Sequence, residues 1–144
     1  MGDMTRAEYV REVTAEVRKK VRKRGTKVGD NTEIWGYTDI IFPKRVTIGR
    51  NCIIASSAAI LTHGVYASLE GGKPVVIGDN CYIGFRATIL PGVTVGNNCI
   101  IGACSVVTKD IPENSVAVGN PARVIGIRDP AELEAYIALR EVGR

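Results

Sequence analysis

The sequence has one histidine, few aromatic residues (6%), and no apolar run long enough to cross a membrane. A single imidazole per chain excludes metal sites built from several histidines, so we expect no metal. A membrane-spanning helix needs about 20 consecutive apolar residues, and a secretory signal needs an apolar core that the first residues lack. We therefore expect a cytoplasmic protein that does not enter a membrane.

Positive charge is confined to one segment. The 144 residues carry a formal net charge of +4, with 19 Lys and Arg against 15 Asp and Glu. Residues 1–27 hold nine basic and four acidic side chains, whereas residues 28–144 hold ten and eleven. A nucleic-acid-binding domain presents a basic surface of its own, so this distribution predicts no nucleic-acid partner. The length and a hydrophobic content of 45% suit one compact domain.

Aliphatic residues recur every six positions, a period that fits neither a helix nor a long strand. They are Val28, Ile34, Ile40, Ile48, Ile54, Ile60, Ile77, Ile83, Ile89, Val95, Ile101 and Val107. Three hexapeptides complete one coil, and all three columns share two insertions, one around Pro43 and one between Ile60 and Ile77. The pattern predicts an all-β fold, a parallel β-helix of about four to five coils.

Two polar columns follow from the same alignment. Asn31, Asn51, Asn80 and Asn98 fall on one corner, where asparagine tolerates left-handed backbone angles, and we interpret them as turn and ladder residues. Cys52, Cys81 and Cys99 fall on an inward column, where we expect them to pack as small hydrophobic residues. Cys104 lies on a corner without a partner histidine, which makes it a poor nucleophile.

Helices are expected on both sides of the repeats. Thr5 and Glu8 form a capping-box pattern ahead of a valine stripe, and Asp129-Pro130 is a typical helix start. The chain is accordingly divided into a basic amphipathic helix at 1–27, the β-helix at 28–126 with a loop insertion at about 63–74, and a C-terminal helix at 127–144. Each helix is expected to cover an open end or side of the β-helix.

His63 stands out by its position. It comes three residues after the inward Ile60, where the regular coil stops and the longer insertion begins. Functional groups concentrate on loops held by rigid scaffolds, and an imidazole suits general-base chemistry near neutral pH. His63 is therefore the candidate catalytic residue.

Four stretches of the repeat region carry a resemblance to a known family. They are Val76–Gly84, Ile89–Gly96, Gly102–Pro112 and Val118–Ile125, the last containing Gly-Asn-Pro-Ala-Arg. Over about residues 28–126 the chain resembles the hexapeptide-repeat acyltransferases, in particular their sugar and polysaccharide O-acetyltransferase branch, which includes galactoside and maltose enzymes. The resemblance implies a left-handed β-helix and a homotrimer with active sites between subunits.

The resemblance also assigns roles to residues. His63 matches the family's general base, which removes the proton from an acceptor hydroxyl as that hydroxyl attacks the thioester of acetyl-CoA directly. The positions implied to bind the coenzyme are Tyr82, Gly84, Phe85, Ala103, Thr108, Lys109 and Arg123. Lys109 would act as a point charge and Arg123 as a planar fork for phosphate oxygens.

Departures from the family pattern leave the acceptor open. Trp35 and Pro43 align with the Asn and Asp that contact sugar in the galactoside and maltose enzymes, and they cannot make the same hydrogen bonds. The particular sugar is therefore not indicated, and we expect the acceptor to be a saccharide or another hydroxylated small molecule. An N-acetyltransferase acting on an amino sugar of a nucleotide-linked intermediate is the alternative enzyme, and a non-catalytic β-helix scaffold is the alternative class. A carbonic-anhydrase-like metalloenzyme needs about three histidine ligands and is excluded.

Overall fold

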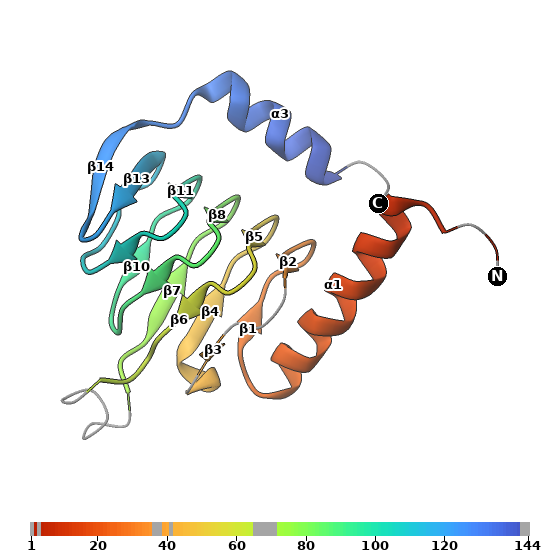
Figure 1. The fold of residues 1–144 in the computed structure, drawn as a ribbon, viewed down its shortest axis with the longest axis horizontal. Helices are drawn as coiled ribbons and strands as arrows, with labels where there is room; N and C mark the ends of the chain where they lie inside the picture. The colour runs from red at the N-terminus through yellow and green to blue at the C-terminus, as the bar shows by residue number, and fades with distance from the viewer. Residues whose placement is uncertain (1, 3, 36–38, 41, 65–71, 142–144) are drawn as a thin grey trace.

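The strands form the three faces of a triangular prism (Figure 1). The computed structural model describes residues 2, 4–35, 39–40, 42–64 and 72–141. The first sheet contains β1 (Lys27–Val28), β4 (Val46–Ile48), β7 (Val75–Ile77) and β10 (Thr94–Val95). The second contains β2 (Glu33–Ile34), β5 (Ile53–Ile54), β8 (Tyr82–Ile83), β11 (Ile100–Ile101), β13 (Ser115–Gly119) and β14 (Ala122–Ile127). The third contains β3 (Asp39–Ile40), β6 (Ala59–Ile60), β9 (Thr88–Ile89) and β12 (Val106–Val107).

The register of the strands confirms the predicted columns and both insertions. Parallel pairing joins Ile48 to Ile77 in the first sheet, Ile54 to Ile83 in the second and Ile60 to Ile89 in the third. The inward isoleucines and valines form one core along the axis, and Ile83, Ile89 and Ile101 have no exposed surface. The shorter insertion contains a 3-10 helix, η1 (Pro43–Arg45).

The predicted asparagine column is confirmed and has a fifth member. Asn31, Asn51, Asn80, Asn98 and Asn114 have φ angles between 57° and 62°. The side-chain amide of each of the first four donates to the side-chain carbonyl of the next asparagine in the column, at distances of 2.9–3.2 Å. The ladder thus satisfies polar groups at a corner that turns in the left-handed region.

The three inward cysteines are fully buried, as predicted, and they also donate hydrogen bonds. Their Sγ atoms donate to carbonyls of the following coil: Cys52 to Gly78 at 3.0 Å, Cys81 to Gly96 at 3.1 Å and Cys99 to Pro112 at 3.1 Å. In the first coil the Thr32 hydroxyl fills this position and donates to the Gly49 carbonyl at 2.6 Å. The column therefore links successive coils as well as packing between them.

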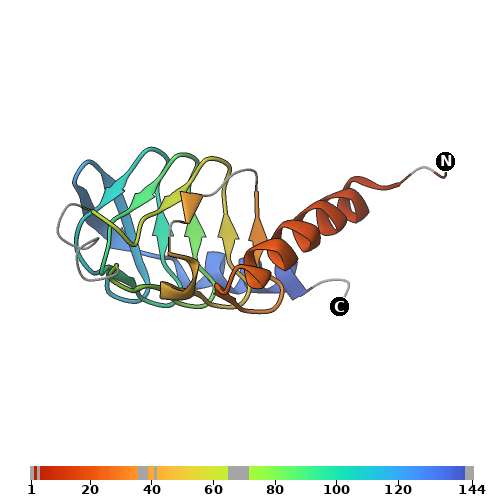
Figure 2. The ribbon, with the colours of Figure 1, turned by 90° about the horizontal axis from the view of Figure 1, so that it is seen from below.

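Helix α1 (Arg6–Lys23) lies against β1 and β2 beside the first coil (Figures 1 and 2). It begins with the predicted capping box, and Gly25 follows its end with a φ of 107°. Val17 and Val21 pack against the core. The helix thereby covers the open end of the stack, where unpaired strand edges would otherwise face solvent.

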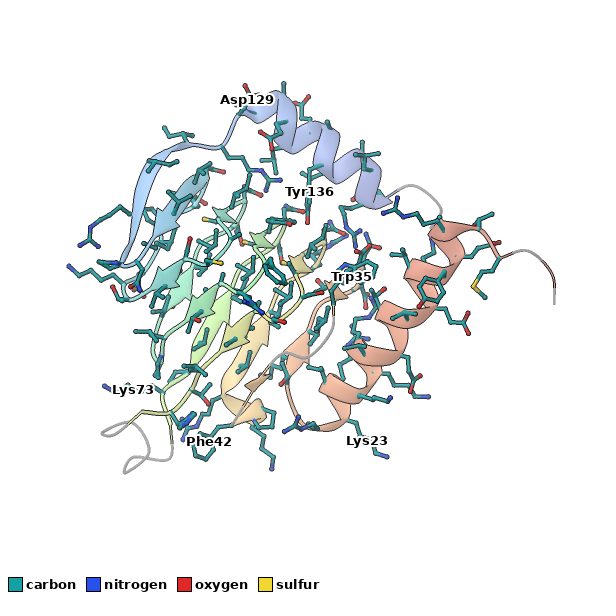
Figure 3. All side chains as sticks on the ribbon, in the orientation of Figure 1. Lys23, Trp35, Phe42, Lys73, Asp129 and Tyr136 are labelled. Atoms are coloured by element: carbon teal, nitrogen blue, oxygen red, sulfur yellow. The ribbon has the colours of Figure 1, made fainter. Side chains whose placement is uncertain are left out.

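Helix α3 (Pro130–Glu141) runs along the asparagine corner, starting from Asp129, whose carboxylate accepts hydrogen bonds from the first turn. The C-terminal segment donates to backbone carbonyls of the ladder: Arg140 to Asn31 at 2.6 Å, Tyr136 to Asn51 at 2.5 Å, and Arg128 to Asn80 and Asn114, both at 2.7 Å. The Arg128 guanidinium also lies 4.5 Å from the Tyr136 ring centre. Polar contacts therefore fix this helix along one edge of the prism (Figure 3).

The end of the repeat region departs from a regular coil. Strand β14 pairs antiparallel with β13, after a turn in which Gly119 has a φ of 101°. Among the described residues no further coil covers this hairpin, and Val124, Ile125 and Ile127 are 49%, 66% and 81% exposed. Neither helix in the described part of the chain is long and apolar enough to cross a membrane.

Candidate active site

His63 lies at the corner where β6 ends, directly after a residue that two hydrogen bonds hold in place. The preceding residue, Thr62, is fully buried. Its hydroxyl accepts a hydrogen bond from the Phe42 N–H at 3.0 Å, and its carbonyl accepts one from the Lys73 N–H at 2.8 Å. These two bonds tie the start of the longer insertion to its end and to the shorter insertion (Figure 3). Of the loop predicted at 63–74, residues 65–71 lie outside the described residues.

The imidazole of His63 is half-buried beside an aromatic ring. The Phe42 ring meets it edge to face, with ring centres 6.3 Å apart and planes at 73°. Its Nδ1 is buried and has no hydrogen-bond partner within the described ranges. Phe42 is not among the site residues predicted from the sequence. The two-residue insertion around Pro43 is the signal for it, because that insertion holds Phe42 at the corner that follows β3.

Thr108 and Lys109 lie on the same corner as His63. They follow β12, which stacks on β9 and then on β6 through the pairs Val106–Thr88 and Thr88–Ala59. Both side chains are exposed. Adjacent strands in a sheet are about 4.8 Å apart, so two coils separate this pair from His63 by about 10 Å along the axis.

The other predicted coenzyme residues lie on the second sheet and at the corner that follows it. Tyr82 and Phe85 are 37% and 46% exposed, and the Phe85 carbonyl accepts a hydrogen bond from the Cys104 N–H at 2.8 Å. Gly84 packs against the next coil so closely that an added Cβ would lie 2.6 Å from the Ala103 nitrogen. This contact requires glycine at position 84.

Arg123 is exposed on β14, where it pairs with Val118 of β13. The seven residues implied to bind coenzyme therefore form two groups, one sharing the corner of His63 and one along the second sheet. The third sheet separates them: Ala103 precedes β12 and Thr108 follows it, and five extended residues span at most about 17 Å.

Comparisons with known proteins agree with this architecture. Residues 74–109 match the family model described as bacterial transferase hexapeptide (six repeats). The chain is 48% identical over 87 residues to the galactoside O-acetyltransferase of Escherichia coli K12, covering 56% of this chain and 43% of that protein.

Two solved structures also align over most of the chain. One is a maltose O-acetyltransferase from Clostridium difficile 630, with 32% identity, a TM-score of 0.62, and coverage of 85% of this chain and 86% of that one. The other is a hexapeptide-repeat-containing acetyltransferase from Vibrio cholerae complexed with acetyl coenzyme A, with 25% identity, a TM-score of 0.60, and coverage of 80% and 78%.

The extent of these matches differs between sequences and structures. The chain spans about half the length of the curated relatives it matches, but most of the length of the maltose O-acetyltransferase structure. The fold that these structures share is the left-handed parallel β-helix, which confirms the handedness expected from the resemblance. With its period of six, its three-sided stack of coils and this structural relative aligned over most of its length, the chain belongs to the hexapeptide-repeat acyltransferase family and is similar to sugar O-acetyltransferases within it.

Proposed function

We propose that this chain transfers an acetyl group from acetyl-CoA to a hydroxyl group of a saccharide-type acceptor, with His63 as the general base. The observation that carries the proposal is the position of His63, the one histidine of the sequence. It lies where the longer insertion begins, on the same corner as Lys109. The donor is supported by the Vibrio cholerae relative complexed with acetyl coenzyme A. The acceptor class is supported by the galactoside and maltose enzymes.

The proposed reaction needs no covalent enzyme intermediate. Neutral His63 takes the proton of the acceptor hydroxyl while that oxygen attacks the thioester carbonyl carbon. The C–S bond of the tetrahedral intermediate then breaks, the acetyl ester forms, and the thiolate of coenzyme A leaves and receives the proton. Backbone N–H groups at the corner would stabilise the negative charge on the carbonyl oxygen.

The divided site supports a proposal about assembly. Coenzyme A is long, and its phosphates need cations at one end of a groove. The His63 corner and the second-sheet group lie on opposite sides of the third sheet. A second copy of the chain packed against the third sheet would place the His63 corner of one subunit beside the second-sheet group of the other. We therefore include in the proposal a homotrimer in which neighbouring subunits complete each site.

The donor half of the proposal is tested by thiol release. Purified protein supplied with acetyl-CoA and a panel of sugars and amino sugars is expected to release free coenzyme A with at least one acceptor. Replacing Arg123 by Gln is expected to raise the KM for acetyl-CoA about tenfold with little change in kcat, because charge-assisted bonds to phosphate are lost. Steady-state kinetics measures both constants.

Arg50→Gln is the matched control, because Arg50 is an exposed arginine on the asparagine corner and is not among the residues implied to bind the coenzyme. Its KM is expected to stay within about twofold of the wild-type value. Release of thiol with amino sugars alone would favour N-acetylation over the proposed O-acetylation. No release with any acceptor would contradict the proposed activity.

The assembly is tested by molar mass. Light scattering on the purified chain is expected to give about three times 15.5 kDa. A monomer that is fully active would show that a single chain completes the site, which contradicts the shared arrangement.

A further inference from the structure

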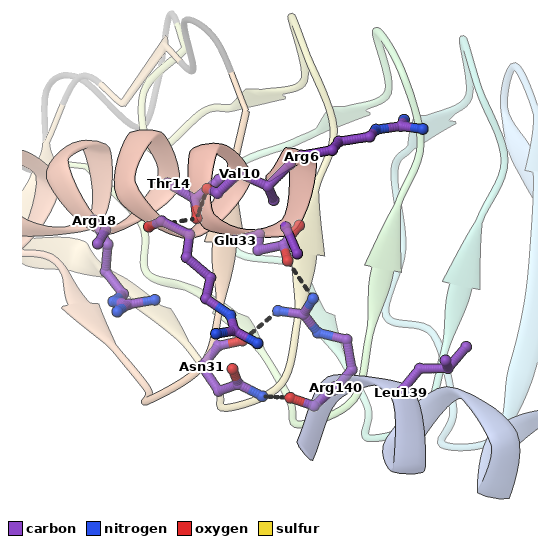
Figure 4. A pocket seen from close by; sticks show the side chains of 11 residues that line it. Arg6, Val10, Thr14, Arg18, Asn31, Glu33, Leu139 and Arg140 are labelled. Atoms are coloured by element: carbon purple, nitrogen blue, oxygen red, sulfur yellow. Dashed lines mark hydrogen bonds and ion pairs between the residues drawn. The ribbon is translucent and has the colours of Figure 1, made fainter. Parts of the chain in front are cut away.

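A second candidate site lies between α1 and α3, beside the first coil (Figure 4). It is a cleft of about 650 Å³, within the range of small-molecule sites. Its lining comes from the two helices and from the residues around β2, and includes neither His63 nor any residue implied to bind the coenzyme. The proposed acetyl transfer therefore leaves this cleft without a role.

Positive charge dominates the lining of the cleft. Four arginines line it, Arg6, Arg11, Arg18 and Arg140, against one carboxylate, Glu33. That carboxylate is already engaged: it pairs with the Arg140 guanidinium, and it accepts a hydrogen bond from the Trp35 indole N–H at 3.0 Å. The cleft thus has three more cations than anions.

The two arginines that reach in from opposite helices retain donor capacity. Arg140 has a buried Nε with no partner among the residues that the structure describes. Arg18 donates from Nη1 to the Thr32 carbonyl at 2.8 Å, and burial together with the nearby Arg22 lowers the pKa of its guanidinium. Each guanidinium has five N–H donors in a planar fork, a geometry that matches the oxygens of phosphate.

The rest of the lining is mostly apolar, with Thr14 and Asn31 as its two uncharged polar residues. Ala7, Val10 and Ala15 contribute from α1, and Leu139, which is 76% exposed, contributes from α3. A cleft of this volume with aliphatic walls has room for an organic group attached to the anion. Inorganic phosphate alone would leave that part unfilled.

We propose that the cleft between α1 and α3 binds a small molecule that carries a phosphate group, with the phosphate held by the arginines and the organic part against the aliphatic side chains. The ligand would bridge the two helices, which are far apart in sequence and both line the cleft beside the first coil. This proposal does not depend on the acetyl-transfer activity, because it concerns different residues and is measured by binding.

Isothermal titration calorimetry on the full chain tests it with phenyl phosphate, inorganic pyrophosphate and phenol. Both phosphates are expected to bind and phenol is not. Replacing Arg6 and Arg11 together by Gln is expected to weaken phenyl phosphate binding at least about tenfold, because two cations leave the lining. The control pair Lys19→Gln and Lys23→Gln makes the same change in net charge on exposed positions of α1 outside the cleft, with an expected effect below about twofold.

A second variant adds a charge without removing any contact. Ala15→Glu is expected to abolish phosphate binding, since it places a carboxylate in the lining while keeping a good helix former. Circular dichroism checks that α1 is retained. The proposal is overturned if neither phosphate binds, if both double variants weaken binding equally, or if Ala15→Glu binds phenyl phosphate as the wild type does.

Discussion

Replacing His63 by alanine is expected to lower the kcat of acetyl transfer at least about a hundredfold, the effect of removing a general base. Thr62, the residue before His63, is held by hydrogen bonds at both its hydroxyl and its carbonyl. These bonds fix the backbone where the longer insertion begins and thereby position the imidazole of His63. The KM for acetyl-CoA is expected to change little, because His63 is not among the residues proposed to bind the coenzyme. Steady-state thiol-release kinetics measures both values.

Cys104→Ser is the control that separates direct transfer from a covalent route. Cys104 is an exposed thiol at a corner, and it is the cysteine a covalent mechanism would use, since the other three are buried. The serine variant is expected to keep wild-type kcat. A His63→Ala variant with wild-type turnover would refute the proposed base, and an inactive Cys104→Ser variant would favour an acyl-enzyme.

Asn80→Ala is expected to lower the free energy of unfolding by about 3 kcal/mol. The variant loses two ladder hydrogen bonds, to Asn51 and Asn98, each contributing about 1 kcal/mol. It also replaces asparagine, which tolerates the left-handed region, by alanine at a φ of 57°, where that conformation costs an ordinary residue about 1 kcal/mol. Urea unfolding at one fixed chain concentration measures the loss, because subunit association would otherwise shift the midpoint.

Two further variants separate these contributions. Asn80→Gly loses the same hydrogen bonds but tolerates the backbone angle, so it is expected to lose about 2 kcal/mol. Ser57→Ala removes a polar side chain at a φ of 60° on an exposed corner where the hydroxyl makes no hydrogen bond within the described chain. That control is expected to change stability by less than about 0.5 kcal/mol. Equal stability of Asn80→Ala and the wild type would mean that the ladder is not stabilising.

The sequence by itself determined the coils. The aliphatic residues of the repeat whose side chains the structure describes face inward, because six residues make one strand and one corner. The period alone therefore identifies the columns, the insertions and the buried cysteines. The same regularity predicted the asparagine corner. It also predicted that His63 lies at the start of an insertion, because all three columns are interrupted between Ile60 and Ile77. Both helix starts could also be predicted from the sequence, because a helix cap depends on residues only about three positions apart.

The C-terminal helix was predicted as an element but its place was not. Its contacts join Tyr136 and Arg140 to backbone carbonyls 85 and 109 residues away. No periodic pattern encodes such bonds, because any exposed carbonyl of a corner offers the same acceptor. Only the docked geometry selects the asparagine corner as the edge that α3 covers.

The candidate sites show the same division. The residue types for acetyl transfer were recognisable along the chain, but the tertiary structure placed them on two edges of one face and set Phe42 beside His63. The positive charge of residues 1–27 was visible in the sequence, but the arginine cleft was not, because Arg140 comes from a second helix on the far side of the β-helix sequence. Repeats determine which way a side chain faces, whereas the packing of distant segments determines which side chains meet.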